Sequence, residues 1–360
     1  MGASGVRRRN AENLVGVLLL ALAAPAQAAP AATGGPGAPT VVAAIHGWTA
    51  WSERVPGGGG FRLVVVTPDH HHERRPPVAT RDVPFDLDGG VDATGDPVVT
   101  YSRCAVEPSI RGGANPHAAG GAPQYTSGRN CSLRILDLRT GGERGIPRAA
   151  GDDSEVLPAL HGRTLAYVAV RRSGNRRRAY LMVRDMYTGA RRVLYAGTRR
   201  RGTTVTAEGP TNVDTDGARV VSAWRHRNVR FGTFDSDVLV QGIDARRPTV
   251  VAAAANSSDT PFVTAFAPTL VGGRVHFLLT FGPGFCERRF ATLGRNPTYG
   301  NQESQSRTSP VSAVVDGPRL VVVEVFADQH RPTLSSSVVQ IISYPETRFG
   351  PDARPGQICG

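Results

Sequence analysis

Short runs of apolar residues, separated by glycine-containing turns, recur along the chain from residue 41 onward. Each recurrence has an apolar strand, a tight turn with glycine, a second apolar strand, a polar loop and a third, alternating strand. The turn glycines are Gly47, Gly95, Gly162, Gly217, Gly272 and Gly317. Their spacings are 48, 67, 55, 55 and 45 residues, and the longest spacing contains the insertion from Ala105 to Asn130. A repeat of this length is typical of a propeller.

The strands of each recurrence are short and rich in Val, Ile and Leu, as β-structure favours. The first two strands fall within residues 41–51, 90–101, 157–168, 212–221, 268–277 and 313–322. The third strands are residues 61–67, 132–138, 179–186, 237–243, 289–293 and 337–344. After two of these, Thr-Gly turns and fourth strands occupy 139–146 and 187–194. We therefore predict an all-β protein, a six-bladed β-propeller of four-stranded antiparallel blades.

Two β-sandwich domains are the alternative, because they too use short strands and frequent turns. Sandwiches do not require one turn chemistry to recur six times, which favours the propeller. Helical periodicity is scarce after the first 30 residues, and 42 Gly with 27 Pro leave little room for long helices.

Two segments resemble a blade of the TolB-type propellers. They are residues 157–167 (LPALHGRTLAY) and 181–189 (LMVRDMYTG), which follow that repeat's proline, glycine turn, apolar-aromatic strand and Asp-x-x-Thr-Gly ending. The second repeat matches in its latter half, whereas the first, fourth, fifth and sixth lack that ending. The resemblance implies an envelope or secreted binding scaffold of bacterial type, and it implies no particular chemistry.

The N-terminus is typical of a secretory signal peptide. Arg7-Arg8-Arg9 precedes an apolar run from Leu14 to Ala24, and small residues allow cleavage after Ala28. We expect a signal peptide at 1–28, a Pro/Gly-rich linker at 29–40 and a single propeller domain at 41–360, in the secreted fraction or cell envelope. An N-terminal core helix and a twin-arginine signal are the alternatives. No later segment is apolar for long enough to predict a transmembrane helix.

The chain is basic, with a formal charge of +12 that falls to about +10 without residues 1–28. It contains no lysine, and its arginines are scattered apart from the cluster Arg171-Arg172, Arg176-Arg177-Arg178 and Arg199-Arg200-Arg201. Stacking aromatics are not interleaved with them, so solvated loops are favoured and no nucleic-acid partner is predicted. Weak attraction to anionic polymers or lipid headgroups remains physically reasonable.

Four cysteines, Cys104, Cys131, Cys286 and Cys359, occur without the CxxC spacing of a zinc site. In an exported chain they predict disulfides, and four cysteines allow three pairings. Cys104 ends one predicted strand and Cys131 begins the next, so this pair would close the base of the long insertion. That leaves Cys286 for Cys359.

No catalytic motif stands out from the sequence. A Gly-x-Ser-x-Gly pentad is absent, so no hydrolase domain is expected. The run His70-His71-His72-Glu73 lacks the second zinc ligand, because Pro76 stands where it should be. We therefore predict no catalytic, cofactor-binding or metal-binding residues, and no cofactor.

Three histidines, His46, His161 and His276, fall near equivalent positions and could line a central funnel, although packing beside the turns is the simpler interpretation. Trp48, Trp51 and Trp224 are expected between sheets. The pair Asp152-Asp153 lies in a turn and suggests no acid/base dyad.

These observations favour a non-enzymatic, monomeric scaffold that binds a protein or an extracellular polysaccharide through its loops, including residues 106–130. The alternative is a secreted carbohydrate-active lyase or hydrolase whose histidines and arginines line the funnel.

Overall fold

The computed structural model describes residues 39–57, 59–109, 124–196, 203–204, 209–228, 233–254, 264–280, 288–292, 298–302, 308–326 and 336–343. The predicted signal peptide, most of the predicted linker, Cys286, Cys359 and Arg199 to Arg201 lie outside these residues. In the described part of the chain, no helix is long and apolar enough to cross a bilayer.

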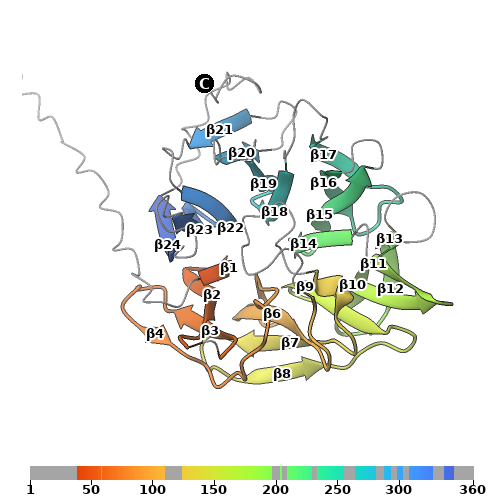
Figure 1. The fold of residues 1–360 in the computed structure, drawn as a ribbon, viewed down its shortest axis with the longest axis horizontal. Coiled ribbons are helices and arrows are strands. Elements are labelled where there is room, and N and C mark those ends of the chain that lie inside the picture. The colour runs from red at the N-terminus through yellow and green to blue at the C-terminus, as the bar shows by residue number, and fades with distance from the viewer. Residues whose placement is uncertain are drawn as a thin grey trace, which may run out of the picture.

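Almost all of the described regular secondary structure is β-strand, arranged in sheets around a common centre (Figure 1). We number six strand groups as units 1 to 6. Unit 1 contains β1 (Pro39–Ile45), β2 (Trp48–Arg54), β3 (Phe61–Val66) and β4 (Glu73–Arg74). Unit 2 contains β5 (Asp88–Val91), β6 (Pro97–Arg103), β7 (Ser132–Asp137) and β8 (Glu143–Ile146). Unit 3 contains β9 (Ser154–His161), β10 (Thr164–Ser173), β11 (Arg176–Asp185) and β12 (Arg191–Tyr195).

The second half of the chain repeats this order. Unit 4 contains β14 (Gly209–Thr215), β15 (Arg219–Asn228), β16 (Thr233–Gly242) and β17 (Thr249–Ala254). Unit 5 contains β18 (Thr264–Val271), β19 (Arg274–Thr280), β20 (Arg288–Thr292) and β21 (Thr298–Gln302). Unit 6 contains β22 (Thr308–Asp316), β23 (Arg319–Phe326) and β24 (Ser336–Ser343). A short β13 (Thr203–Thr204) pairs with β11, and the 3-10 helix η1 (Tyr125–Ser127) precedes β7.

The hydrogen bonding departs from six separate four-stranded sheets in two ways. Units 2 and 3 belong to one sheet, because β5 and β9 share a parallel bridge between Val91 and His161. Glycine at position 90 allows this close approach. A β-carbon there would overlap the carbonyl oxygen of Leu160, so only glycine fits. Unit 6 has three described strands.

The first turn of every unit has the conformation that its sequence predicted. All six turn glycines have positive φ, from 56° to 91°, and each lies between the first and second strands of its unit. Glycine adopts this left-handed conformation without steric cost, whereas most residues do not. The turn chemistry therefore marks where each unit begins.

The hydrophobic core is divided among the junctions between consecutive units. Leu165 to Val170 of β10 are all buried, because unit 3 packs against a neighbour on each face. At one of these junctions Trp224 of unit 4 makes an edge-to-face contact with Tyr195 of unit 3, with ring centroids 4.7 Å apart. Each buried apolar side chain of this size stabilises the fold by about 1.5–3 kcal/mol.

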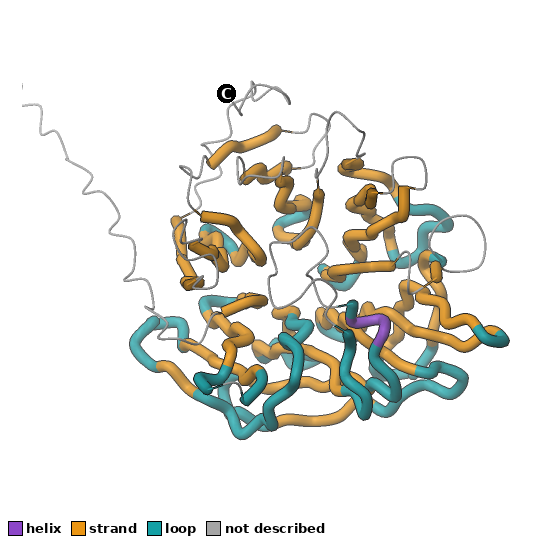
Figure 2. The backbone as a smooth tube through the Cα atoms, in the orientation of Figure 1, coloured by secondary structure: helices purple, strands orange, loops and turns teal. Residues whose placement is uncertain are grey.

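The last unit packs against the first. Val321 and Val323 of β23 share a buried cluster with Val42 and Trp51 of unit 1. The innermost strand β22 contacts β1, just as each earlier innermost strand contacts the next one along the chain. The arrangement of sheets around the centre is visible in the backbone trace (Figure 2).

Candidate functional site

A small cavity lies among the inner strands of the first four units. Its volume is about 40 Å³, which leaves room for about two or three water molecules. It is lined by Val41, Asp86, Leu87, Asp88, Tyr125, Leu157, Pro158, Asn212 and Val213. Polar side chains from units 2 and 4 therefore face one confined space.

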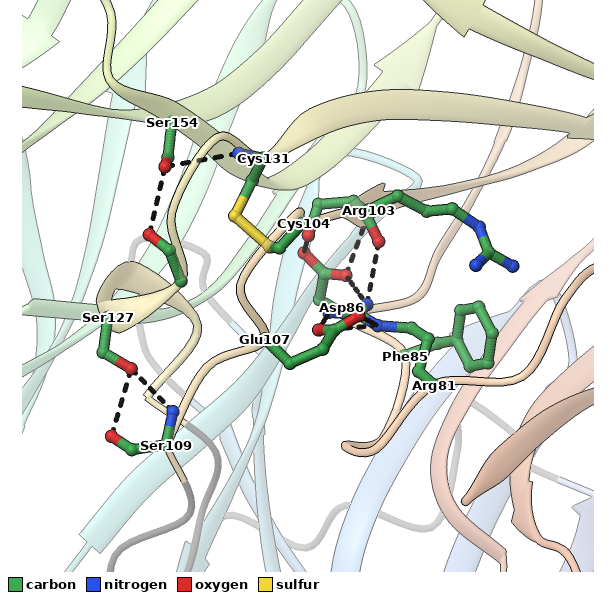
Figure 3. Close-up of polar contacts among 12 residues, drawn as sticks. Arg81, Phe85, Asp86, Arg103, Cys104, Glu107, Ser109, Ser127, Cys131 and Ser154 are labelled. Carbon is green, nitrogen blue, oxygen red and sulfur yellow. Dashed lines mark hydrogen bonds and ion pairs between the residues drawn. A yellow bond between two sulfur atoms is a disulfide. The ribbon is translucent and has the colours of Figure 1, made fainter. Parts of the chain in front are cut away.

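Asp86 is the most heavily bonded side chain at this cavity. Its carboxylate accepts hydrogen bonds from the Ser102 amide (2.9 Å), the Ser102 hydroxyl (2.6 Å) and the Leu157 amide (2.8 Å). It also pairs with the Arg81 guanidinium at 3.0 Å (Figure 3). Asp86 thus joins the segment before β5 to β6 in its own unit and to β9 in unit 3.

Arg81 lies between two carboxylates and is fully buried. Its guanidinium contacts Asp86 on one side and Glu107 at 2.7 Å on the other, and it donates to the Ser102 carbonyl at 2.8 Å. Burial lowers the pKa of Arg81, but the two carboxylates raise it by more, so the net shift is upward. A buried charge is tolerated where it is paired and hydrogen-bonded, and Arg81 satisfies that condition.

Asp88 and Asp214 form an acidic pair near the cavity. Burial raises the pKa of Asp88 well above its usual value, and the nearby Asp214 raises it further. Burial raises the pKa of Asp214 to about 7, against the lowering effect of amide hydrogen bonds from Leu270 (2.5 Å) and Thr215 (2.6 Å). The Oδ2 atom of Asp88 has no hydrogen-bond partner among the described residues. Burial and mutual proximity therefore favour the protonated form of these carboxyls.

Tyr125 covers one side of the cavity from η1. Its hydroxyl is buried and has no hydrogen-bond partner within the described ranges. Burial raises the pKa of Tyr125, and the negative charge of Asp86 raises it further, so the phenol stays protonated.

A disulfide joins Cys104 to Cys131 at the base of the insertion (Figure 3). Beside it, the Cys131 amide donates to Ser154 Oγ at 3.3 Å, and Ser154 Oγ donates to the Gly128 carbonyl at 3.0 Å. The Ser109 amide donates to Ser127 Oγ at 2.8 Å. Both ends of the segment between residues 110 and 123 are therefore held to the sheets. The pairing of Cys286 with Cys359 falls outside the described residues and stays a prediction.

The histidines lie away from this cavity. His276 is buried on β19, and burial lowers its pKa to about 4, with a further lowering effect from Arg274. His161 ends β9 and lies beside Gly217 in the β14–β15 turn. His46 lies in the exposed β1–β2 turn. None of these three side chains lines the cavity.

Other residues singled out from the sequence have structural contacts. His70 approaches Arg319 of unit 6 at 3.3 Å, while His71 and His72 are exposed. Asp152 is buried and pairs with Arg171 and Arg191. Among the residues that the structure describes, no group of three or more His, Cys, Asp or Glu side chains has the geometry to hold a metal ion.

Comparison with known proteins gives no family. No family model matches the chain, and no curated protein matches it. Among solved structures it is similar to a prolyl endopeptidase (11% identity, TM-score 0.47, 89% of this chain and 43% of that chain). It is also similar to TolB from Acinetobacter baumannii (12%, 0.43, 84% and 65%) and to an oligogalacturonate lyase in complex with manganese (11%, 0.44, 90% and 96%).

The fold is all-β and propeller-like, as the strand order and the contacts between innermost strands show. The chain spans less than two thirds of the prolyl endopeptidase and TolB chains that it matches. At this level of similarity no activity passes from those proteins to this one. The predicted membership of the TolB-type family therefore stays a prediction.

The sequence did not reveal the Asp88 and Asp214 pair, because these residues are 126 positions apart. One local signal was present: both carboxylates lie on innermost strands, where apolar or small side chains dominate. A charged residue on a strand that is covered on both faces is a candidate for a functional or a structural role.

Proposed function

We propose that this protein is an exported, non-enzymatic scaffold that binds a protein or a polysaccharide through its loop face, including residues 106–130. The observation that carries this proposal is that the polar groups around the centre make structural contacts with one another. Asp86, Arg81 and Ser102 join neighbouring segments, and the Cys104–Cys131 disulfide fixes the base of the insertion. A loop held at both ends loses less conformational entropy when it binds a partner.

We also propose that the six units are the blades of one closed propeller. Contacts between innermost strands run in chain order and return from β22 to β1, which supports closure. A single bridge joins units 2 and 3, so their shared sheet is consistent with two adjacent blades.

Export is proposed from the N-terminal sequence, with support from the disulfide. Residues 1–28 have the layout of a secretory signal peptide. Disulfides form and persist in oxidising compartments, so the Cys104–Cys131 bond is in keeping with a secreted or envelope location.

The test is a binding screen of the mature chain against arrays of polysaccharides and envelope proteins. The scaffold proposal predicts saturable binding without any change in the ligand's chain length. A Cys104→Ser/Cys131→Ser variant should bind at least several-fold more weakly, since its insertion is released. Absence of binding to every array member by the folded protein would contradict the proposal.

A carbohydrate-active enzyme is the second candidate, and the Asp88 and Asp214 pair is the observation that favours it. Two buried carboxyl groups with raised pKa values, that of Asp214 to about 7, can serve as general acid and base. This candidate predicts that bound polysaccharides are shortened and that Asp214→Asn abolishes the cleavage. Asp185→Asn, at the end of β11, is the control and should leave cleavage unchanged.

A further inference from the structure

Positive charge is concentrated in unit 3. The segment from residue 147 to residue 196 contains ten arginines and four carboxylates, a formal charge of +6 out of +12 for the whole chain. Unit 3 lies on the far side of the ring from β24 (Figure 1). Half of the net charge is therefore carried by about one seventh of the sequence.

The β10–β11 hairpin places these arginines directly opposite one another. Arg171 pairs in register with Arg178, and Arg172 pairs with Arg177. Side chains at such cross-strand positions are about 4.5–5.5 Å apart at their β-carbons, and like charges there destabilise a sheet. Four arginines in two facing pairs therefore lower the stability of this hairpin.

Internal carboxylates neutralise only part of this charge. Arg171 and Arg191 share Asp152, at 2.7 Å and 3.1 Å, and Arg177 pairs with Asp153 at 2.8 Å. These three arginines are held against the loop before β9 and are at most one third exposed.

Two arginines at the end of the hairpin differ from Arg171, Arg177 and Arg191. Arg172 and Arg176 are exposed, and within the described part of the chain neither has a carboxylate at ion-pair distance. They flank the Gly174-Asn175 turn from opposite faces, since Arg172 is paired with Arg177 whereas Arg176 is paired with Ser173. A flexible chain crossing the turn can reach both guanidinium groups.

We propose that the tip of the β10–β11 hairpin, defined by Arg172 and Arg176, is a binding site for an acidic polysaccharide. This inference rests on the proposed scaffold function and names its ligand class. The planar guanidinium forms paired hydrogen bonds with carboxylate or sulfate groups, which acidic polysaccharides carry along their length.

The surroundings of the tip favour a polysaccharide over other polyanions. Single-stranded nucleic acid is held by aromatic stacking as well as charge, and residues 171–178 contain no aromatic side chain. Amphipathic anchoring in a lipid surface uses apolar side chains beside the charged ones, and the exposed Tyr187 lies beyond the opposite end of β11. The tip residues Ser173, Gly174 and Asn175 are polar or small.

The test compares the mature protein with an Arg172→Ser/Arg176→Ser variant for binding to alginate, a carboxylated polysaccharide. Arg246→Ser/Arg247→Ser is the matched control, because it removes two exposed arginines from the β16–β17 turn of unit 4, outside the insertion. Neutral dextran, single-stranded DNA and vesicles with anionic lipid are the comparison ligands. Equal melting temperatures establish that all three proteins are folded.

We expect alginate affinity to fall at least tenfold in the tip variant, to stay within twofold in the control, and to weaken as salt rises. An equal loss in both variants would overturn the site, since net charge would then explain binding. Tighter binding of DNA or vesicles than of alginate would overturn the ligand class. Binding of the unmodified protein to array members, with none to alginate, would reject this inference while the scaffold proposal stood. No binding to any ligand would reject both.

Discussion

Asp316 and Gly47 are 269 residues apart in the sequence and are joined by a hydrogen bond of 2.8 Å from the Gly47 amide to Asp316 Oδ2. The His46 amide donates to the other carboxylate oxygen of Asp316 at 2.9 Å. Arg319 pairs with Asp316 and donates to the Gly47 carbonyl at 2.9 Å. The β22–β23 turn of the last unit thus holds the β1–β2 turn of the first.

The same motif acts at an internal junction. Asp216-Gly-Ala-Arg219 in unit 4 matches Asp316-Gly-Pro-Arg319 in unit 6. Arg219 pairs with Asp216 at 2.6 Å and donates to the Gly273 carbonyl of unit 5 at 3.2 Å. Unit 6 therefore contacts unit 1 in the same way as unit 4 contacts unit 5, as a closed ring requires.

Removing the Arg319 guanidinium should weaken ring closure. Arg319→Met keeps the apolar stem but loses the bonds to Asp316 and Gly47, so we expect a loss of about 1–3 kcal/mol in the free energy of unfolding. Urea denaturation measures it. Arg163→Met, which removes a more exposed ion pair within unit 3, is the control and should leave the midpoint near that of the unmodified protein. Equal midpoints for all three proteins would contradict the closure role.

Breaking the Cys104–Cys131 disulfide should destabilise the protein. The bond closes a loop with a sequence separation of 27, for which the chain-entropy relation gives about 3.5 kcal/mol. Cys104→Ala/Cys131→Ala should lower the urea midpoint accordingly. A reducing agent should have little further effect on the variant, because the variant no longer contains this bond. A variant as stable as the unmodified protein would contradict the structural role assigned to the bond.

Gly90→Ala should be among the most damaging small substitutions in the chain. A β-carbon there would overlap the Leu160 carbonyl oxygen, so β5 and β9 would have to separate. Gly242→Ala is the control, since the new β-carbon would lie 3.6 Å from the β-carbon of Ala245, an ordinary contact distance. Thermal melting should show a loss of several degrees for the first variant and little change for the second. The reverse order would contradict the β5–β9 contact.

The pH dependence of stability should carry a contribution from Glu155. Burial raises the pKa of Glu155 to about 7, and the neighbouring Asp152 adds to the effect. Folding therefore favours the protonated form. This contribution to stability is fully present below the pKa of the unfolded chain, near 4.5, and is lost as pH rises through about 7.

Glu155→Gln should remove that contribution. Urea midpoints measured between pH 5 and pH 8 should fall less steeply for this variant than for the unmodified protein. Glu53→Gln, on β2 of unit 1, serves as the control carboxylate. An unchanged slope in Glu155→Gln would show that Glu155 titrates normally in the folded protein.

The sequence predicted the repeat well, because its turns depend on local chemistry. Gly47 and Gly217 have positive φ, a backbone conformation that favours glycine in any turn. The strands on either side are apolar because they are buried on both faces. The β5–β9 bridge could not be predicted, since it depends on how two units approach in space. The same holds for Asp88 and Asp214, whose raised pKa values arise from burial and proximity between distant segments.

Hydrogen exchange at the His46 and Gly47 amides, followed by NMR, tests ring closure most directly. Both amides lie in an exposed or half-buried turn, and each donates to Asp316 in the last unit. We predict that they exchange slowly in the unmodified protein and rapidly in Asp316→Ala, while the Gly95 amide, which donates to Asp92 within unit 2, is unchanged. Equally rapid exchange of the His46 and Gly47 amides in both proteins would contradict a ring closed between the last unit and the first.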